Sequence, residues 1–246
     1  DNVHVPMMRA GEKFNRLYAY WGVATSNLAT PRVQELEAEW EPKLATFFDE
    51  ISLDPALFAR NKAVYDNRAN LGLNAQQMRI VERSYDDYVR NGSALNPAQK
   101  AQLTAINTEL AGLFAEFGSK LLADEQTYTV VTNEAELAGL EPAFKASLAE
   151  AAAASGHPGA WAIKNTRSSA QPVMQYASNR ALRERVWRAF TSRGDNGNAN
   201  DTKGTIARIL RLRQDRAVLL GFRTHANYRM ADTMAQTPEH AMDLMM

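Results

Sequence analysis

A single helical period dominates this chain. Between residues 98 and 123, apolar side chains recur at steps of three and four along the sequence: Leu103, Ile106, Leu110, Leu113, Phe114, Phe117 and Leu121. Steps of this size place side chains on one face of an α-helix, whereas a half-buried strand requires steps of two. The sequence therefore predicts a long amphipathic helix with a buried apolar face.

Four prolines mark predicted helix starts. A polar residue that can cap a helix stands directly before each of Pro31, Pro55, Pro97 and Pro238. Proline suits the first helical position because the N–H that it lacks would be unpaired there. With the apolar period, these signals predict helices at about 8–28, 31–51, 55–70, 74–91, 97–123, 134–139, 142–155, 179–193, 200–220, 224–231 and from 238 onward.

Two short stretches depart from the helical period. Residues 127–132 are β-branched and aromatic, and residues 160–165 place Trp161 and Ile163 two positions apart. Both stretches are predicted to be strands that pair with each other, with a helical segment between them. We expect an all-α fold, mainly helical, with one small β-hairpin. The polar stretch 194–201 contains no large apolar residue and is predicted to be a mobile loop.

Composition excludes several kinds of chemistry. The chain has no cysteine, which excludes disulfides, thiolate zinc sites, iron–sulfur clusters and a cysteine nucleophile. Its 28 basic and 28 acidic residues balance, so net charge gives no reason to expect nucleic acid or an anionic membrane as partner. No apolar run approaches the length of a membrane helix, roughly 20 residues.

No catalytic motif is present in these 246 residues. None of His4, His157, His225 and His240 has a second histidine three to five positions away, so the metallohydrolase pattern His-Glu-x-x-His is missing. A Gly-x-Ser-x-Gly turn and a phosphate-binding loop are missing as well. The sequence therefore assigns no catalytic, no cofactor-binding and no metal-binding residue.

Basic residues concentrate between Arg180 and Arg223. This segment holds eleven basic side chains against four acidic ones. One interpretation is a surface that binds nucleic acid, but no aromatic residues alternate with the arginines as in single-strand binders. We favour the alternative, in which these side chains pair with acidic residues on neighbouring helices, and Arg211 with Asp215 one turn away.

Thirteen short segments, most of them from Trp161 onward, follow one another in a familiar order. They are 51–53, 57–60, 71–73, 161–166, 171–173, 179–184, 187–190, 200–202, 209–213, 217–222, 226–228, 230–232 and 234–239. This order resembles the thimet-oligopeptidase family of zinc metallopeptidases, most closely its bacterial peptidyl-dipeptidase branch. The resemblance extends over nearly the whole length of the chain.

The resemblance implies the N-terminal part of an elongated helical enzyme that is split by a deep substrate channel. It implies three regions: an N-terminal helical region at 1–126, a strand pair with its helical excursion at 127–178, and the start of the peptidase domain at 179–246. In this family the zinc motif lies further along the chain, so no zinc ligand or catalytic residue transfers to this sequence. The helix start at Thr237-Pro238, so close to residue 246, fits a chain that continues.

The implied activity is zinc-dependent hydrolysis of short peptides, with this chain as scaffold and channel wall and a C-terminal catalytic half as its partner. We expect this part alone to be inactive, and we expect neither nucleic acid nor membrane as partner. The implied location is the cytoplasm, or the periplasm if a secretion signal has been removed. The alternative is a non-catalytic helical interaction protein, which an open reading frame ending after residue 246 would favour.

Overall fold

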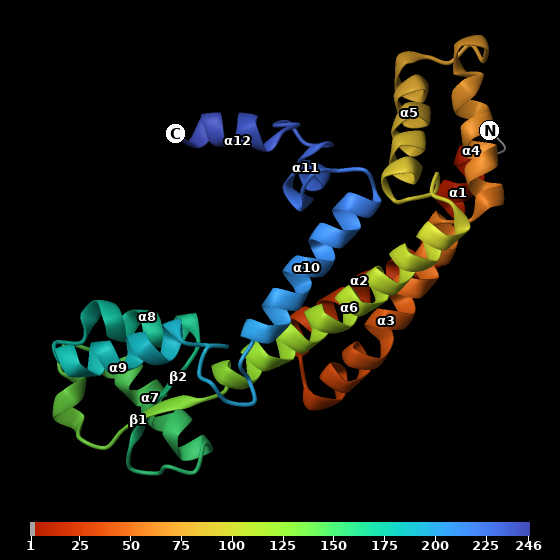
Figure 1. Ribbon diagram of the computed structural model, residues 1–246. Helices are drawn as coiled ribbons and strands as arrows, with labels where there is room; N and C mark the ends of the chain where they lie inside the picture. Colours follow the sequence, from red (N-terminus) through yellow and green to blue (C-terminus); the bar gives the residue numbers. More distant parts are fainter. Residues whose placement is uncertain (1–2) are drawn as a thin grey trace. The chain divides into compact units, whose positions relative to one another are not determined.

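The computed structural model describes residues 3–246 (Figure 1). Its first half contains the helices α1 (His4–Ala10), α2 (Glu12–Val23), α3 (Pro31–Ser52), α4 (Pro55–Asp66), α5 (Ala75–Arg90) and α6 (Pro97–Glu125). Then follow strand β1 (Tyr128–Val131), α7 (Pro142–Ala154), strand β2 (Trp161–Lys164), α8 (Arg167–Tyr176), α9 (Arg180–Thr191), α10 (Lys203–Leu219), α11 (His225–Met230) and α12 (Pro238–Met245). Short turns of π- or 3-10 helix are η1 (Ala24–Leu28), η2 (Arg68–Asn70) and η3 (Glu134–Leu137). The expected fold class is confirmed.

All four helices that were predicted to begin at proline do so. The side chains of Thr30, Asp54 and Thr237 accept hydrogen bonds from backbone N–H groups three residues on, as N-caps do. Before α6, Asn96 and Gln99 exchange side-chain-to-backbone hydrogen bonds of 2.9 and 3.1 Å, which form a capping box. These starts are therefore set locally, by one cap and one proline each.

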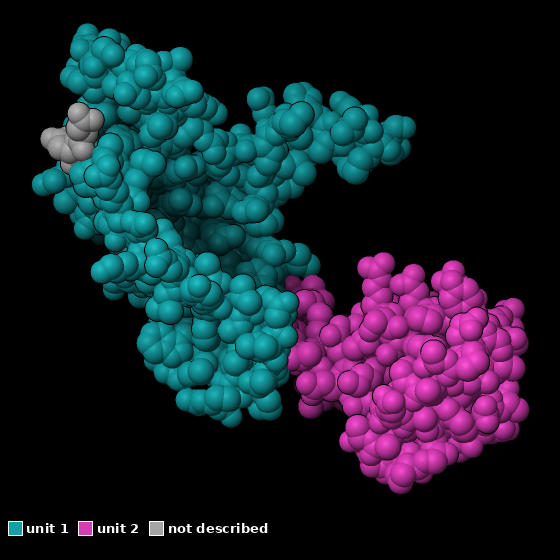
Figure 2. Space-filling view, turned by 180° about the vertical axis from the view of Figure 1, so that it is seen from behind, with its two compact units in different colours: residues 1–115, 208–246 teal, residues 116–207 magenta. Residues whose placement is uncertain are grey.

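The chain divides into two compact units, which Figure 2 shows in different colours. Unit 1 comprises residues 1–115 and 208–246, and unit 2 comprises Glu116–Ala207. The division falls inside α6 and inside α10. The three regions expected from the sequence follow family resemblance and remain a prediction. No helix within residues 3–246 has both the length and the apolar character that crossing a membrane requires.

Unit 1 is held together by helices that lie side by side (Figure 1). Phe14 of α2 contacts the rings of Phe47 and Phe48 on α3, with centroids 5.1 and 5.8 Å apart. The predicted apolar stripe of α6 is buried at Leu103, Ile106 and Leu110. Phe114 was predicted on the same stripe but is 42% exposed, and the guanidinium of Arg213 lies 5.1 Å from its ring.

Unit 2 is built around the two-stranded sheet. The strands are antiparallel, with Val131 opposite Trp161 and Thr129 opposite Ile163, which confirms the predicted pair. Val131 and Ile163 lie in the main core of the unit. Successive residues of a strand point to opposite faces, so Ala162 joins a second cluster with Ala152 of α7. The excursion between the strands thus covers one face of the sheet.

Two helix predictions need correction. The first predicted helix, 8–28, is divided at Gly11 and ends in the π-helical turn η1. Helix α8 was not predicted. It contains Pro172, which lacks the N–H that a helix interior uses, yet its neighbours Ala170 and Val173 are fully buried. Tertiary burial therefore stabilises this helix against its own local sequence.

The loop 194–201 is tied down by a buried carboxylate. Asp124 is 2% exposed and accepts hydrogen bonds from the Gly194 backbone N–H at 2.8 Å, Asn196 Nδ2 at 2.9 Å and Asn200 Nδ2 at 2.8 Å. Burial acts to raise the pKa of Asp124, but these hydrogen bonds and nearby Arg193 outweigh it and lower the pKa. These polar groups attach the loop to Asp124, and its greater mobility than the flanking helices remains a prediction.

Candidate functional site

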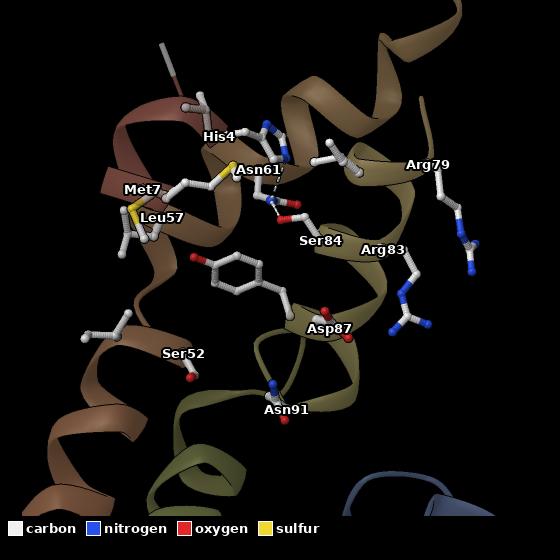
Figure 3. Close-up of a pocket in the computed structure, with 15 residues that line it drawn as sticks. His4, Met7, Ser52, Leu57, Asn61, Arg79, Arg83, Ser84, Asp87 and Asn91 are labelled. Atoms are coloured by element: carbon white, nitrogen blue, oxygen red, sulfur yellow. Dashed lines mark hydrogen bonds between the residues drawn. The ribbon is translucent and has the colours of Figure 1, made fainter. Parts of the chain in front are cut away.

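A cavity of about 530 Å³ opens between α1, α3, α4 and α5 in unit 1 (Figure 3). Its size is in the range of small-molecule pockets. Most of its wall is apolar, and a few polar groups are set into it. The lining residues are Val3, His4, Met7, Met8, Ile51, Ser52, Leu57, Asn61, Arg79, Ile80, Arg83, Ser84, Asp87, Tyr88 and Asn91.

Aromatic packing fixes the two helices that carry the polar groups. Tyr65 of α4 stacks on Tyr85 of α5 with ring centroids 3.9 Å apart, and Phe58 stacks on Tyr85 at 6.0 Å. Arg68 covers the outer side of Tyr65 at 4.0 Å. These contacts hold α4 against α5, so residues on their facing sides are placed within hydrogen-bonding distance.

Asn61 is the polar centre of this cavity. It is 3% exposed, and its Nδ2 donates a hydrogen bond of 2.6 Å to Ser84 Oγ, with His4 Nε2 at 3.5 Å on the other side (Figure 3). Its Oδ1 is buried and has no partner within the described chain. Burial lowers the pKa of His4, which favours the neutral form of its imidazole.

A second polar network in unit 1 connects α3, α6 and α10. Asn107 Nδ2 donates to both carboxylate oxygens of Asp49, at 2.9 and 3.0 Å, and Asn107 Oδ1 accepts from Arg216 at 3.2 Å. Burial raises the pKa of Asp49, against the lowering effect of these hydrogen bonds and of Arg216. The amide thus bridges an acid and a base that do not touch each other.

The same network continues to α5 and α11 around Tyr228. The guanidinium groups of Arg90 and Arg216 each lie 5.7 Å from the Tyr228 ring. Arg90 also forms an ion pair of 2.9 Å with Asp232, which pairs with Arg83 as well. These contacts link the 208–246 part of unit 1 to α5.

Six of the eleven basic side chains of the segment form ion pairs within the described residues. Arg185, Arg193 and Arg208 contact acidic residues earlier in the chain, and other basic side chains of the segment pair locally. The pairs are Arg185–Glu136, Arg193–Glu125, Arg208–Glu109, Arg188–Glu184, Lys203–Asp195, Lys203–Asp201 and Arg223–Glu239. The first three pairs join the segment to acidic residues before residue 180, as the favoured interpretation predicts. The expected pair Arg211–Asp215 was wrong, since no ion pair joins these two described residues.

A zinc ion does not fit the residues that the structure describes. Within 3–246, no group of three or more histidine and carboxylate side chains could hold a metal ion. His4 belongs to α1, His225 to α11 and His240 to α12, while His157 follows α7. That this sequence contains no catalytic, no cofactor-binding and no metal-binding residue remains a prediction.

Sequence reasoning did not single out Asn61 or Ser84. A signal was available, because Asn61 stands four residues after Leu57 and four before Tyr65, both on the inner side of α4. A polar residue at such a helical spacing among apolar ones predicts a buried amide. That its oxygen lacks a partner could not be predicted, because this depends on where α1 and α5 lie.

The chain is similar in sequence to one family of peptidases. Residues 173–246 match the model of peptidase family M3. Across its whole length, the chain is 34% identical to the dipeptidyl carboxypeptidase of Escherichia coli, covering 100% of this chain and 36% of that protein. It is 33% identical over 241 residues to the probable cytosolic oligopeptidase A of Arabidopsis thaliana, covering 94% of this chain and 34% of the relative.

A more distant relative agrees with this assignment. Oligopeptidase A of Escherichia coli is 26% identical over 250 residues, covering 100% of this chain and 37% of its own length. The chain thus spans about a third of the length of the curated relatives it matches. The resemblance to M3 peptidases inferred from the residues is confirmed, and residues before 173 align with the same relatives.

Proposed function

We propose that this chain is the helical N-terminal part of a zinc-dependent peptidase that hydrolyses short peptides. The observation that carries the proposal is the match of residues 173–246 to peptidase family M3, together with an alignment over the whole chain that covers 36% of a dipeptidyl carboxypeptidase. In this proposal the chain supplies scaffold and one wall of a substrate channel. The hydrolytic chemistry belongs to the C-terminal half of the same protein.

The zinc ligands in this proposal lie outside the 246 residues. The four histidines are scattered over α1, α11, α12 and the segment after α7, and the described residues offer no three-ligand group. A catalytic zinc usually takes three ligands from protein. In this proposal the arginine-rich segment 180–223 has a structural role. Short peptides are the expected substrates. The proposed location is the cytoplasm, with the periplasm as alternative.

The proposal predicts that the 246-residue chain alone neither binds zinc stoichiometrically nor cleaves peptides. Isothermal titration with zinc and release of dipeptides from a fluorogenic peptide measure the two properties. The chain mixed with the C-terminal half of the protein should gain activity that a chelator removes. Chelator-sensitive turnover by the 246-residue chain alone would contradict the proposal. The absence of peptidase activity from both the mixture and the uninterrupted protein would contradict it as well.

A further inference from the structure

Helix α12 is well formed but has little packed against it within the described chain. Thr237 caps it, Pro238 occupies its first position, and an ion pair of 3.1 Å joins its first turn to Arg223. No other hydrogen bond or ion pair joins α12 to a described residue before Ala235, and none of its side chains is buried. In Figure 1 only α11 is drawn close to it.

The apolar side chains of α12 gather on one face. Pro238, Met242 and Met245 follow one another at steps of four and three, which place them along one side of a helix, with Ala241 beside them. Met242 and Met245 are 50% and 69% exposed. The other side of the helix carries its polar side chains, Glu239, His240 and Asp243. A helix of eight residues is marginal in water by itself, so a partner on the apolar face is expected.

The segment that precedes α12 is attached to the rest of unit 1. Asp232 pairs with Arg83 and Arg90 of α5, and Arg90 donates a hydrogen bond of 3.2 Å to the backbone oxygen of Tyr228. Helix α12 therefore continues from an anchored segment, and its apolar face is presented by a held helix.

The size and charge of this face select its partner. Four side chains of one short helix offer far less than the roughly 800 Å² per partner that a stable complex of separate molecules buries. A segment of the same polypeptide can dock on so small a face, because covalent linkage raises its local concentration. Glu239 and Asp243 on the polar side disfavour an anionic membrane surface as the partner.

The comparisons with relatives indicate such a segment. Residues 173–246, which include α12, match peptidase family M3, and the chain covers only 36% of the dipeptidyl carboxypeptidase of Escherichia coli. We propose that the apolar face of α12 docks into an apolar groove of the C-terminal half of the same protein. Pro238, Met242 and Met245 have the spacing of anchors in helix-in-groove contacts, and methionine adapts readily to such a groove. The inference rests on the proposed function, which supplies the C-terminal half.

Oxidation of methionine tests whether this face is covered. Hydrogen peroxide transfers one oxygen atom to the sulfur of an accessible methionine and leaves as water, so the rate of sulfoxide formation reports exposure. Mass spectrometry should show Met242 and Met245 oxidised about tenfold more slowly in the uninterrupted protein than in the 246-residue chain. Equal rates would overturn the proposal. Protection that rises with the concentration of the 246-residue chain would also overturn it, because a second copy would then be the occupant.

A pair of variants locates the contact on the helix. Met245→Lys should leave the melting temperature of the 246-residue chain unchanged, since the side chain is exposed there. In the uninterrupted protein it should lower the melting temperature and restore fast oxidation of Met242. Asp243→Lys introduces the same side chain on the polar side and should change neither property. Full protection of Met242 in Met245→Lys, or equal loss of stability in both lengths of chain, would refute the docking.

The two proposals fail separately in these experiments, because oxidation and melting do not require catalysis. An uninterrupted protein that protects Met242 but hydrolyses no peptide would refute the peptidase activity and support the docking. An active peptidase with both methionines unprotected would refute the docking alone.

Discussion

At the scale of single residues, buried polar groups determine where this protein is sensitive to change. Asp124 and Asn61 are both nearly inaccessible, at 2% and 3% exposure. Asp124 has three hydrogen bonds to the loop 194–201, whereas Asn61 has one polar atom unused. The first is therefore a structural anchor, and the second leaves one buried polar atom without a partner among the described residues.

Asp124→Ala should destabilise the chain by about 3 kcal/mol, because it leaves the buried Gly194 N–H and two amide groups without their charged acceptor. Chemical denaturation followed by circular dichroism measures this loss. Asp195→Ala is the matched control, since Asp195 lies in the same loop, is exposed and pairs only with Lys203. The melting temperature of this control should hardly change, and equal losses in both variants would contradict the anchoring role.

Stability should also depend on the partly buried histidines His4 and His225. Burial lowers the pKa of His225, with the charges of Arg213, Arg216 and Arg229 acting in the same direction, and burial also lowers the pKa of His4. The unfolded chain then binds protons more readily than the folded one, so the free energy of unfolding should fall as pH drops below about 6.5.

Denaturation curves at pH 7.5 and at pH 5.5 test this dependence. The variant His225→Gln should lose less stability over this interval than the parent chain, and a double variant with His4→Gln should lose least. A free energy of unfolding that rises between pH 7.5 and pH 5.5 would show that the predicted direction of the pH dependence is wrong.

At the scale of elements, local sequence signals determine where some helices begin, and tertiary contacts stabilise others. Helices that begin at Pro31, Pro55, Pro97 and Pro238 were predictable, since each start depends on neighbouring residues alone. Helix α8 was not, because Pro172 weakens it and burial of Val173 restores it. The strand pair was predictable from β-branched residues, but Asn61 of α4 required knowledge of α1 and α5.

The turn after η3 offers a test at this scale. Gly139 and Gly156 both have positive φ, 89° and 83°, so alanine at either should cost about 1–2 kcal/mol in backbone strain. A Cβ at Gly139 would lie 2.4 Å from the backbone oxygen of Tyr176, whereas a Cβ at Gly156 meets no atom within 4 Å.

Gly139→Ala should therefore be clearly more destabilising than Gly156→Ala in thermal denaturation. Gly156→Ala is the control for the strain that both positions share. If both variants melt at the same temperature, the close approach of residues 139 and 176 is not what requires glycine at this turn.

At the scale of the whole molecule, the two units differ in how the chain supplies them. Unit 2 is one continuous segment, Glu116–Ala207, with its own core around Val131, Leu137 and Leu182. Unit 1 needs two separate segments, joined by contacts such as Arg208 with Glu109 and Arg216 with Asn107. Sequence periodicity locates helices but does not reveal which distant segments share a core.

A peptide of residues 116–207 should therefore fold by itself and unfold cooperatively, because its core is complete within the segment. A peptide of residues 1–115 should be less stable than unit 1 in the whole chain, since it lacks α10. Near-ultraviolet circular dichroism and thermal melts of each peptide, measured beside the whole chain, test both expectations. A disordered 116–207 peptide would contradict the independence of this core.

The pairing of β1 with β2 has a consequence for the order of folding. No tight turn joins the strands, because residues 132–160 with η3 and α7 stand between Val131 and its partner Trp161. Closing so long a loop has an entropic cost that a short hairpin avoids, so the sheet should form only after α7 has formed and brought the strands together. This small sheet would then be among the last structures to appear during refolding, and amides of β1 should gain protection from hydrogen exchange after those of α7.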